Sequence, residues 1–176
     1  MEKFAFILHP LSLQDMEHLS PLMRYIPDPI IEACLKMKKP FKVSHITGIK
    51  SPYAEAEGWF IGCPLTAKQM VELPEEFVMD RIIESGKVAQ ELGAKIVGLG
   101  AFTSIVGDAG ITVAKNLDIA VTSGNSYTVA TAIQGTKQAA RMMGKDLKEC
   151  RAVIVGATGS IGAASVRLLE KEVKHI

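Results

Sequence analysis

Three glycines near the C-terminus have a spacing that suits a phosphate-binding turn. Gly156, Gly159 and Gly162 follow the apolar run Ala152–Val155 and lead into a helix with one apolar face. We expect Gly156 to allow a tight turn where a side chain would clash, Gly159 to let backbone N–H groups approach a diphosphate, and Gly162 to let the helix pack against a sheet. The phosphates would lie at the helix N-terminus, where unpaired N–H groups and the helix dipole favour anions.

The spacing is GxxGxxG rather than the commoner GxGxxG, with Ala157 and Thr158 between the first two glycines. Thr158 or Ser160 is available to cap the helix. The pattern predicts the first strand and helix of a Rossmann-type nucleotide-binding domain, although a purely structural strand–helix turn is the alternative. The candidate cofactor-binding residues are Gly156, Thr158, Gly159, Ser160, Ile161 and Gly162.

Two further polar turns lie between an expected strand and an expected helix. The first, Gly98–Ile105, carries small hydroxyl residues, and the second, Thr122–Thr128, carries hydroxyls and an amide. In an open α/β sheet, both would lie beyond the carboxyl ends of strands, where ligands bind. The candidate residues of a substrate or cofactor cleft are Thr103, Ser104, Thr122, Gly124, Asn125 and Ser126, and the alternative is that both turns only cap helices.

No catalytic group can be assigned from spacing. His9 ends an apolar run and His45 lies within another, so we expect both to be hydrogen-bonded structural residues. Three cysteines, Cys34, Cys63 and Cys150, are far apart and show no CxxC spacing, which argues against a disulfide framework or a zinc site. We expect the cysteines to be buried small hydrophobes rather than nucleophiles, and we expect no metal site.

Apolar runs alternate with helical stretches, which predicts an α/β fold with a parallel or mixed sheet and helices on both faces. This sheet would be followed by the start of a Rossmann-type NAD(P)-binding domain. The expected strands are residues 4–8, 41–49, 57–61, 96–99, 119–121 and 152–155. The expected helices run from Ser12 toward Met23, over 30–37, from Pro74 to Gly93, over 127–143 and after the glycine turn.

The expected domain organisation is a substrate-side α/β domain over residues 1–125, a connecting helix and linker over 126–150, and an incomplete dinucleotide-binding domain over 151–176. A dinucleotide half-site needs a second strand whose end carries an acidic residue about 20 residues beyond the turn. Glu170 and Glu172 fall on the helix instead, and the sequence stops at Ile176. We therefore expect the chain to be a fragment of a longer protein; docking of residues 152–176 on the first domain or on a second chain is the alternative.

Composition excludes several functional classes. The chain has 176 residues, 20 basic and 19 acidic side chains and a net charge of +1, so no nucleic-acid partner is expected. No window reaches the ~18 uninterrupted apolar residues of a membrane span, and the N-terminal apolar run is too short for a secretory signal. The cysteine usage predicts a reducing, cytoplasmic location.

Three motifs together give the chain a family resemblance. GAFTSIV (100–106), TSGNSYT (122–128) and VGATGSIGAA (155–164) resemble, in order and separation, the N-terminal half of long-chain acyl-(acyl-carrier-protein) reductases. The resemblance covers most of the chain and implies reduction of a fatty acyl thioester to an aldehyde by NADPH, with acyl carrier protein as an expected carrier of the acyl group. It also implies an acyl-cysteine intermediate on a cysteine of the later half, so none of the three present cysteines inherits that role. Gly156, Gly159, Ser160, Ile161 and Gly162 match the family's cofactor turn.

Other interpretations remain open. The domain order also resembles shikimate dehydrogenase-like and glutamyl-tRNA reductase-like proteins. A dehydrogenase for a small hydroxy or amino acid would need a Lys–Asp pair facing the cleft, for which Lys50 and Lys115 are available. A non-catalytic nucleotide-binding module is a further alternative. The lone final strand makes a homodimer plausible, and we expect the 176-residue chain by itself to have no reductase activity.

Overall fold

A computed structural model describes residues 1–17 and 21–176 of the chain. The chain divides into two compact units, Met1–Ser123 (unit 1) and Gly124–Ile176 (unit 2). The expected domains over 1–125, 126–150 and 151–176 remain a prediction. Across the described residues, every helix is too short or too polar to cross a bilayer.

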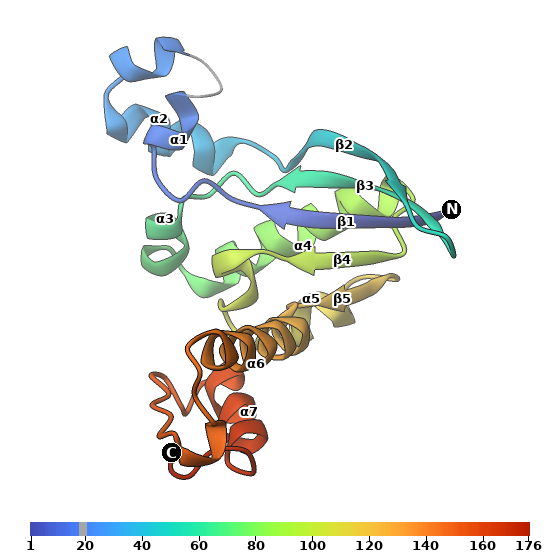
Figure 1. The fold of residues 1–176 in the computed structure, drawn as a ribbon. Helices are drawn as coiled ribbons and strands as arrows, with labels where there is room; N and C mark the ends of the chain where they lie inside the picture. The colour runs from blue at the N-terminus through green and yellow to red at the C-terminus, as the bar shows by residue number, and fades with distance from the viewer. Residues whose placement is uncertain (18–20) are drawn as a thin grey trace. The chain divides into compact units, whose positions relative to one another are not determined.

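Unit 1 contains a five-stranded sheet in the order β2-β3-β1-β4-β5 (Figure 1). β1, β3, β4 and β5 run parallel, and β2 pairs antiparallel with β3 at one edge. The strands are β1 (Glu2–Leu8), β2 (Phe41–Lys50), β3 (Glu55–Gly62), β4 (Ile96–Leu99) and β5 (Ala120–Thr122). Together with the flanking helices, this mixed sheet confirms the predicted α/β class.

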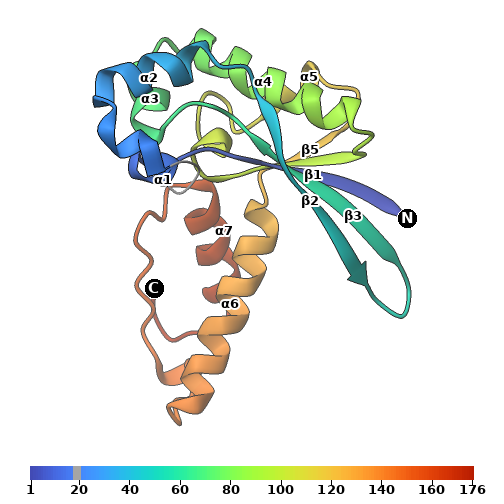
Figure 2. The same cartoon turned by 90° about the horizontal axis from the view of Figure 1, so that it is seen from above.

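The helices of unit 1 lie between the strands in sequence and flank the sheet (Figure 2). They are α1 (Gln14–Glu17), η1 (Pro21–Tyr25), α2 (Asp28–Met37), α3 (Ala67–Glu72), α4 (Glu75–Glu91), η2 (Ala101–Ser104) and α5 (Ile111–Lys115). Of the helix expected from Ser12 toward Met23, the structure describes the four-residue α1 and the 3-10 helix η1. Residues 18–20 of that expected helix lie outside the described residues.

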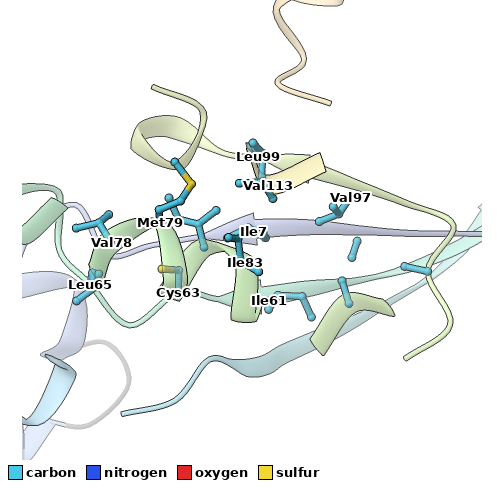
Figure 3. Packing of buried hydrophobic residues seen from close by; sticks show 14 of the residues in the cluster. Ile7, Ile61, Cys63, Leu65, Val78, Met79, Ile83, Val97, Leu99 and Val113 are labelled. Atoms are coloured by element: carbon cyan, nitrogen blue, oxygen red, sulfur yellow. The ribbon is translucent and has the colours of Figure 1, made fainter. Parts of the chain in front are cut away.

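The core of unit 1 forms between one face of the sheet and α4 (Figure 3). Because side chains alternate along a strand, Ala5 and Ile7 of the central strand β1 point to this face. Ile7 pairs with Ile61 of β3 and with Leu99 of β4, and all three are buried. α4 contributes side chains at helical spacing, including Val78, Met79, Ile82, Ile83 and Ala89. Burial of apolar side chains from four elements makes this the main stabilising contact of unit 1.

On the other face of the sheet, phenylalanine rings of β1 lie over glycines of neighbouring strands. A Cβ at Gly58 would lie 2.7 Å from the Phe4 ring, and a Cβ at Gly98 would lie 2.5 Å from the Phe6 ring. These distances are far below contact, so each glycine makes room for an aromatic ring. The Phe6 side chain still exposes 37% of its surface, so this face is less well covered than the α4 face.

Unit 2 is built around two helices, α6 (Asn125–Met142) and α7 (Ser160–Leu169), with η3 (Leu147–Glu149) between them. Val129 and Ile133 of α6 pack with Leu169 of α7 in a small apolar core. Two polar side-chain contacts join the segments: Asn125 with Ser160, and Lys137 with Glu172. Residues 125 and 137 are twelve positions apart in the sequence, and so are residues 160 and 172. Equal spacing on both sides shows that the two helices run parallel, with their N-termini at the same end.

The prediction of a buried strand at residues 152–155 is wrong. The segment is extended without being part of a sheet, and the side chains of Val153 and Val155 are 83% and 94% exposed, while Ile154 packs against the core of unit 2. A strand needs neighbouring strands for its hydrogen bonds, and among the described residues this segment pairs only through one isolated bridge, Arg151 with His175.

That bridge nevertheless has the geometry of a parallel ladder. The Lys174 amide donates to the Cys150 carbonyl at 3.0 Å, and the Ala152 amide donates to the His175 carbonyl at 2.9 Å. Residues 150–152 and 174–175 are therefore paired in parallel on either side of α7. Two extended segments paired by one bridge on either side of a helix are compatible with the predicted beginning of a Rossmann-type unit.

Gly135 provides a stability test of unit 2. It lies in the middle of α6, and a Cβ built there meets no atom within 4 Å. We expect Gly135→Ala to raise the free energy of unfolding by about 0.5–1 kcal/mol, because alanine loses less backbone entropy in a helix. Thermal unfolding followed by circular dichroism measures this change. An unchanged or lowered thermal midpoint would show that residue 135 does not lie inside a helix with open space around its Cβ position.

Candidate functional site

The glycine turn leads directly into α7. Gly156 adopts a φ of +77°, a left-handed conformation that disfavours residues with a side chain. The Gly159 amide donates to the Gly156 carbonyl at 3.0 Å and closes the turn, and Gly159 is the N-cap of the helix. The chain therefore reverses within four residues and enters a helix, as the spacing predicts.

The structure changes the physical reason for glycine at two of the three positions. A Cβ at Gly156 would meet nothing within 4 Å, so the need for glycine there comes from its positive φ rather than from a clash. A Cβ at Gly162 would lie 2.1 Å from the Gly156 carbonyl oxygen, so Gly162 allows α7 to approach the turn itself rather than a sheet. At Gly159 the nearest atom to a Cβ is at 3.4 Å, an ordinary contact. Gly159 is thus the one glycine of the three that the turn itself does not require.

The first turn of α7 presents its backbone amides without a side-chain cap. The expected capping of the helix by Thr158 or Ser160 is wrong, because the N-cap is Gly159 and, among the described residues, no side chain bonds to the amides there. The N–H groups of Ser160, Ile161 and Gly162 precede the first α7 amide that bonds within the helix, that of Ala163 to the Gly159 carbonyl. Residues 156–161 are all exposed, so this end of the helix is open to solvent.

The second polar turn supplies a second helix N-terminus of the same kind. Gly124, with a φ of +74°, is the N-cap of α6 and receives the Thr128 amide at its carbonyl, and within the described chain no side chain caps this helix. Asn125, the first residue of α6, donates from its side-chain Nδ2 to Ser160 Oγ at 2.8 Å. Ser126 follows it and is exposed. The structure therefore brings together Asn125 and Ser160, which the sequence places in separate motifs.

This pairing has an electrostatic consequence. The positive ends of the dipoles of α6 and α7 lie side by side, because the two helices are parallel and joined at their first residues. The Asn125 amide occupies a lone pair of Ser160 Oγ, which leaves the Ser160 hydroxyl proton to be donated elsewhere. An anion at this end of unit 2 would meet backbone amides, a hydroxyl donor and two favourable dipoles.

Thr122 lies at the end of β5, the last strand of unit 1, opposite Gly98 of β4. Its placement at the carboxyl end of a parallel strand is that expected from the sequence.

The remaining polar turn, after β4, uses its hydroxyls internally. Thr103 is only 1% exposed and donates to the Gly100 carbonyl at 2.7 Å. Ser104 donates to the Ala101 carbonyl at 2.7 Å. Ala101 has a φ of +47°, an uncommon conformation for a residue other than glycine. The structure thus places the hydroxyls of Thr103 and Ser104 in the internal hydrogen bonding of this turn.

His9 connects the end of β1 to this same turn, a role that the sequence does not show. The Phe102 amide donates to His9 Nε2 at 3.1 Å, so Nε2 carries no proton and Nδ1–H donates to the Pro10 carbonyl at 3.0 Å. The expectation of a hydrogen-bonded structural histidine is confirmed for His9, and also for His45, which stacks on Trp59 and bonds to Glu57. Burial lowers the pKa of His9, with opposing effects from the Pro10 carbonyl and Asp15.

We expect acid to destabilise unit 1 through His9. Because the folded-state pKa lies below the ordinary value of 6.5, the unfolded chain binds a proton first as the pH falls. The stabilising contribution is complete above pH 6.5 and is lost as the pH falls through the folded-state pKa. Unfolding midpoints measured between pH 8 and pH 5 should fall more for the wild-type chain than for His9→Gln, whose amide does not titrate. Parallel pH profiles for the two proteins would contradict this role.

The cysteines divide into three environments. Cys63 is fully buried, and burial raises the pKa of its thiol to about 11, so it is a small hydrophobe as expected. Cys150 is partly buried and donates to the Asp146 carbonyl. For Cys34 the expectation of burial is wrong: α2 buries Ile31 and Leu35, and Cys34 lies on its solvent side. Among the described residues, no group of three or more His, Cys, Asp or Glu side chains is arranged to hold a metal ion.

Comparison with known proteins finds two informative relatives, whereas no model of a known protein family matches the chain. The chain is 34% identical over 128 residues, 73% of its length, to a Serratia protein named Aminotransferase PigE, of which the match covers 14%. It is 26% identical over 184 aligned positions, 95% of its length, to the long-chain acyl-(acyl-carrier-protein) reductase of Synechococcus elongatus, of which the match covers 51%. The chain thus spans about half of one relative and a small part of the other.

Proposed function

We propose that unit 2 binds the diphosphate of a nicotinamide dinucleotide at the N-termini of α6 and α7. The observation that supports this most is the open first turn of α7 beside Gly159, joined to the first turn of α6 by the 2.8 Å contact between Asn125 and Ser160. The proposed contacts are the Gly159–Gly162 backbone and the Ser160 hydroxyl, which Asn125 orients, with Gly156 and Thr158 forming the turn. Phosphate groups bind where unpaired amides and helix dipoles converge.

We further propose that the chain is part of an oxidoreductase that reduces a fatty acyl thioester to an aldehyde. The similarity to the reductase over 95% of the chain supports this, and an acyl carrier protein would then carry the substrate. A nicotinamide held there would supply the hydride for this reduction, with one proton taken up and the thiol released. Cys63 is not a candidate nucleophile, since burial raises the pKa of its thiol to about 11. We expect the 176-residue chain to form no aldehyde by itself.

The similarity to an aminotransferase favours a second candidate ligand, pyridoxal phosphate, because its phosphate also suits a helix N-terminus. The match covers only 14% of that protein, which leaves most of its length to carry the activity in its name. We therefore propose that the shared segment is a module common to both relatives. The small-molecule dehydrogenase alternative gains no support from Lys50, which pairs with Glu55 across the β2–β3 hairpin.

Equilibrium titration of the chain with NADPH, NADH and pyridoxal phosphate tests the proposal. We expect a change in nicotinamide fluorescence with NADPH or NADH that inorganic pyrophosphate competes away. Preference between the two nicotinamides will show whether a 2′-phosphate is recognised. Binding of pyridoxal phosphate alone, or of none of these compounds, would contradict the proposed function.

Asn125 and Ser160 should act on nucleotide binding as one unit. We expect Asn125→Ala and Ser160→Ala each to weaken NADPH binding by about three- to tenfold. Asn125→Ala removes the contact that orients the Ser160 hydroxyl, and Ser160→Ala removes the hydroxyl itself. The double variant should bind no more weakly than Ser160→Ala, because the two changes remove the same interaction. If the loss of NADPH affinity in the double variant equals the product of the two single losses, the two side chains contribute independently, contrary to this prediction.

A further inference from the structure

A small pocket lies in unit 1 at the carboxyl ends of β1 and β3. Its volume is about 190 Å³. Its apolar walls come from both strands, from β2 and from α2, and include Leu8, Leu35, Phe41, Val43 and Cys63. The carboxyl ends of parallel strands are where open α/β sheets bind ligands. The pocket therefore has both the place and the lining of a small-molecule site.

Gly62, the last residue of β3, lines the pocket without a side chain. A Cβ at Gly62 would lie 3.1 Å from both Phe41 and Val43, closer than a relaxed contact. Because residue 62 is a glycine, the side chains of Phe41 and Val43 can pack directly against the backbone of β3. This part of the pocket is thus apolar and uncharged.

Three polar side chains border the pocket, and two of them are already engaged. Asp15 accepts hydrogen bonds from the backbone amides of Leu11 and Ser12 at 2.8 and 3.0 Å. Both ring nitrogens of His9 are bonded within the protein. Lys38 lies over the Phe41 ring, 4.0 Å from its centroid, and forms no ion pair among the described residues. Asp15 uses only Oδ2 in these bonds and can only accept, so the Lys38 ammonium is the hydrogen-bond donor at this pocket that remains available for a ligand.

We propose that this pocket binds a short-chain carboxylate, with the alkyl chain among Leu8, Leu35 and Val43 and the carboxylate on the Lys38 ammonium. A volume of about 190 Å³ equals about six water volumes, so a chain of about six carbons fills it. An unpaired cation at the edge of an apolar pocket selects an anion with an apolar tail. This site goes beyond the proposed function and does not require that a nucleotide bind to unit 2.

Titration of the 176-residue chain with hexanoate, hexanol and hexylammonium, followed by NMR, tests the proposal. We expect hexanoate to bind at least about fivefold more tightly than either of the other two, and dodecanoate to gain nothing from its longer tail. Equal binding of hexylammonium would overturn the role of Lys38, and much tighter binding of dodecanoate would overturn the size limit. Absence of hexanoate binding would overturn the proposal as a whole.

Two variants with a matched control locate the site. Lys38→Met keeps the apolar stem beside Phe41 and should weaken hexanoate binding about fivefold, whereas Lys39→Met, an exposed neighbour outside the pocket, should leave it unchanged. Val43→Trp should fill the pocket and abolish binding; Val43 lies on the edge strand and is partly exposed, so the fold should tolerate the change. Equal losses in the two lysine variants would mean nonspecific surface binding and overturn the proposal. NADPH affinity, measured on the same proteins, should not change.

Discussion

Gly159→Val should weaken NADPH binding by at least about a hundredfold while the chain stays folded. The φ of −75° and ψ of 164° at Gly159 suit a β-branched residue, and a Cβ there meets no atom closer than 3.4 Å. The valine side chain would occupy the space in front of the α7 amides. Loss of two hydrogen bonds to a charged phosphate costs about 3 kcal/mol or more, which corresponds to that fold-change.

Gly162→Ala is the matched contrast to this variant. Its Cβ would lie 2.1 Å from the Gly156 carbonyl oxygen, so the turn must move and unit 2 should lose stability together with nucleotide binding. Valine is a poorer N-cap than glycine, so Gly159→Val itself should lower stability by at most about 1 kcal/mol. Circular dichroism and fluorescence titration of both variants separate these effects. Unchanged NADPH affinity in folded Gly159→Val would refute the assignment of this turn.

Ile7→Ala should lower the free energy of unfolding of unit 1 by about 2–5 kcal/mol. Ile7 is fully buried on the central strand, between Ile61 and Leu99 of the two neighbouring strands. Truncation removes buried methyl and methylene groups and leaves a cavity that the sheet and α4 can close only in part. Urea unfolding followed by circular dichroism gives the change in free energy.

Ile105→Ala serves as the control for this prediction. Ile105 follows η2 and is 67% exposed, so its truncation should change stability by less than about 0.5 kcal/mol. A loss at Ile7 no larger than that at Ile105 would contradict the placement of β1 at the centre of the core.

Much of unit 1 could be predicted because its sequence signals are local. Apolar runs mark β1 and β4, and Pro74 with the following glutamates marks the start of α4. The mixed nature of the sheet was predicted only as one of two possibilities, because pairing between distant strands leaves no local signal. The described part of the helix expected after Ser12 consists of α1 and the 3-10 helix η1, and apolar spacing alone does not distinguish a 3-10 segment from an α-helix.

The error at residues 152–155 has a different origin. Four consecutive apolar residues predict a buried strand on composition alone, yet a strand is stable only beside another. Unit 2 supplies a single bridge at His175 and an apolar contact for Ile154, and Val153 and Val155 remain exposed. Local sequence shows the tendency of this segment to extend, whereas its burial depends on neighbours that the sequence pattern does not reveal.

The candidate site was predictable as a set of motifs but not as an arrangement. The glycine spacing indicates the turn before α7, and the polar run after β5 indicates the start of α6. Contact between Asn125 and Ser160, 35 residues apart, follows from the parallel packing of two helices. Capping was predicted wrongly, because a glycine rather than a hydroxyl residue occupies the N-cap of α7. The link from His9 to Phe102 likewise spans 93 residues and has no sequence signal.

Amide NMR spectra of the 15N-labelled chain during NADPH addition test the diphosphate site most directly. The backbone signals of Gly159, Ser160, Ile161 and Gly162, together with the Asn125 side-chain amide, should shift most and should saturate together. Inorganic pyrophosphate should move the same signals in the same direction. Saturating shifts confined to other residues, with these five signals unmoved, would contradict diphosphate binding at the paired N-termini of α6 and α7.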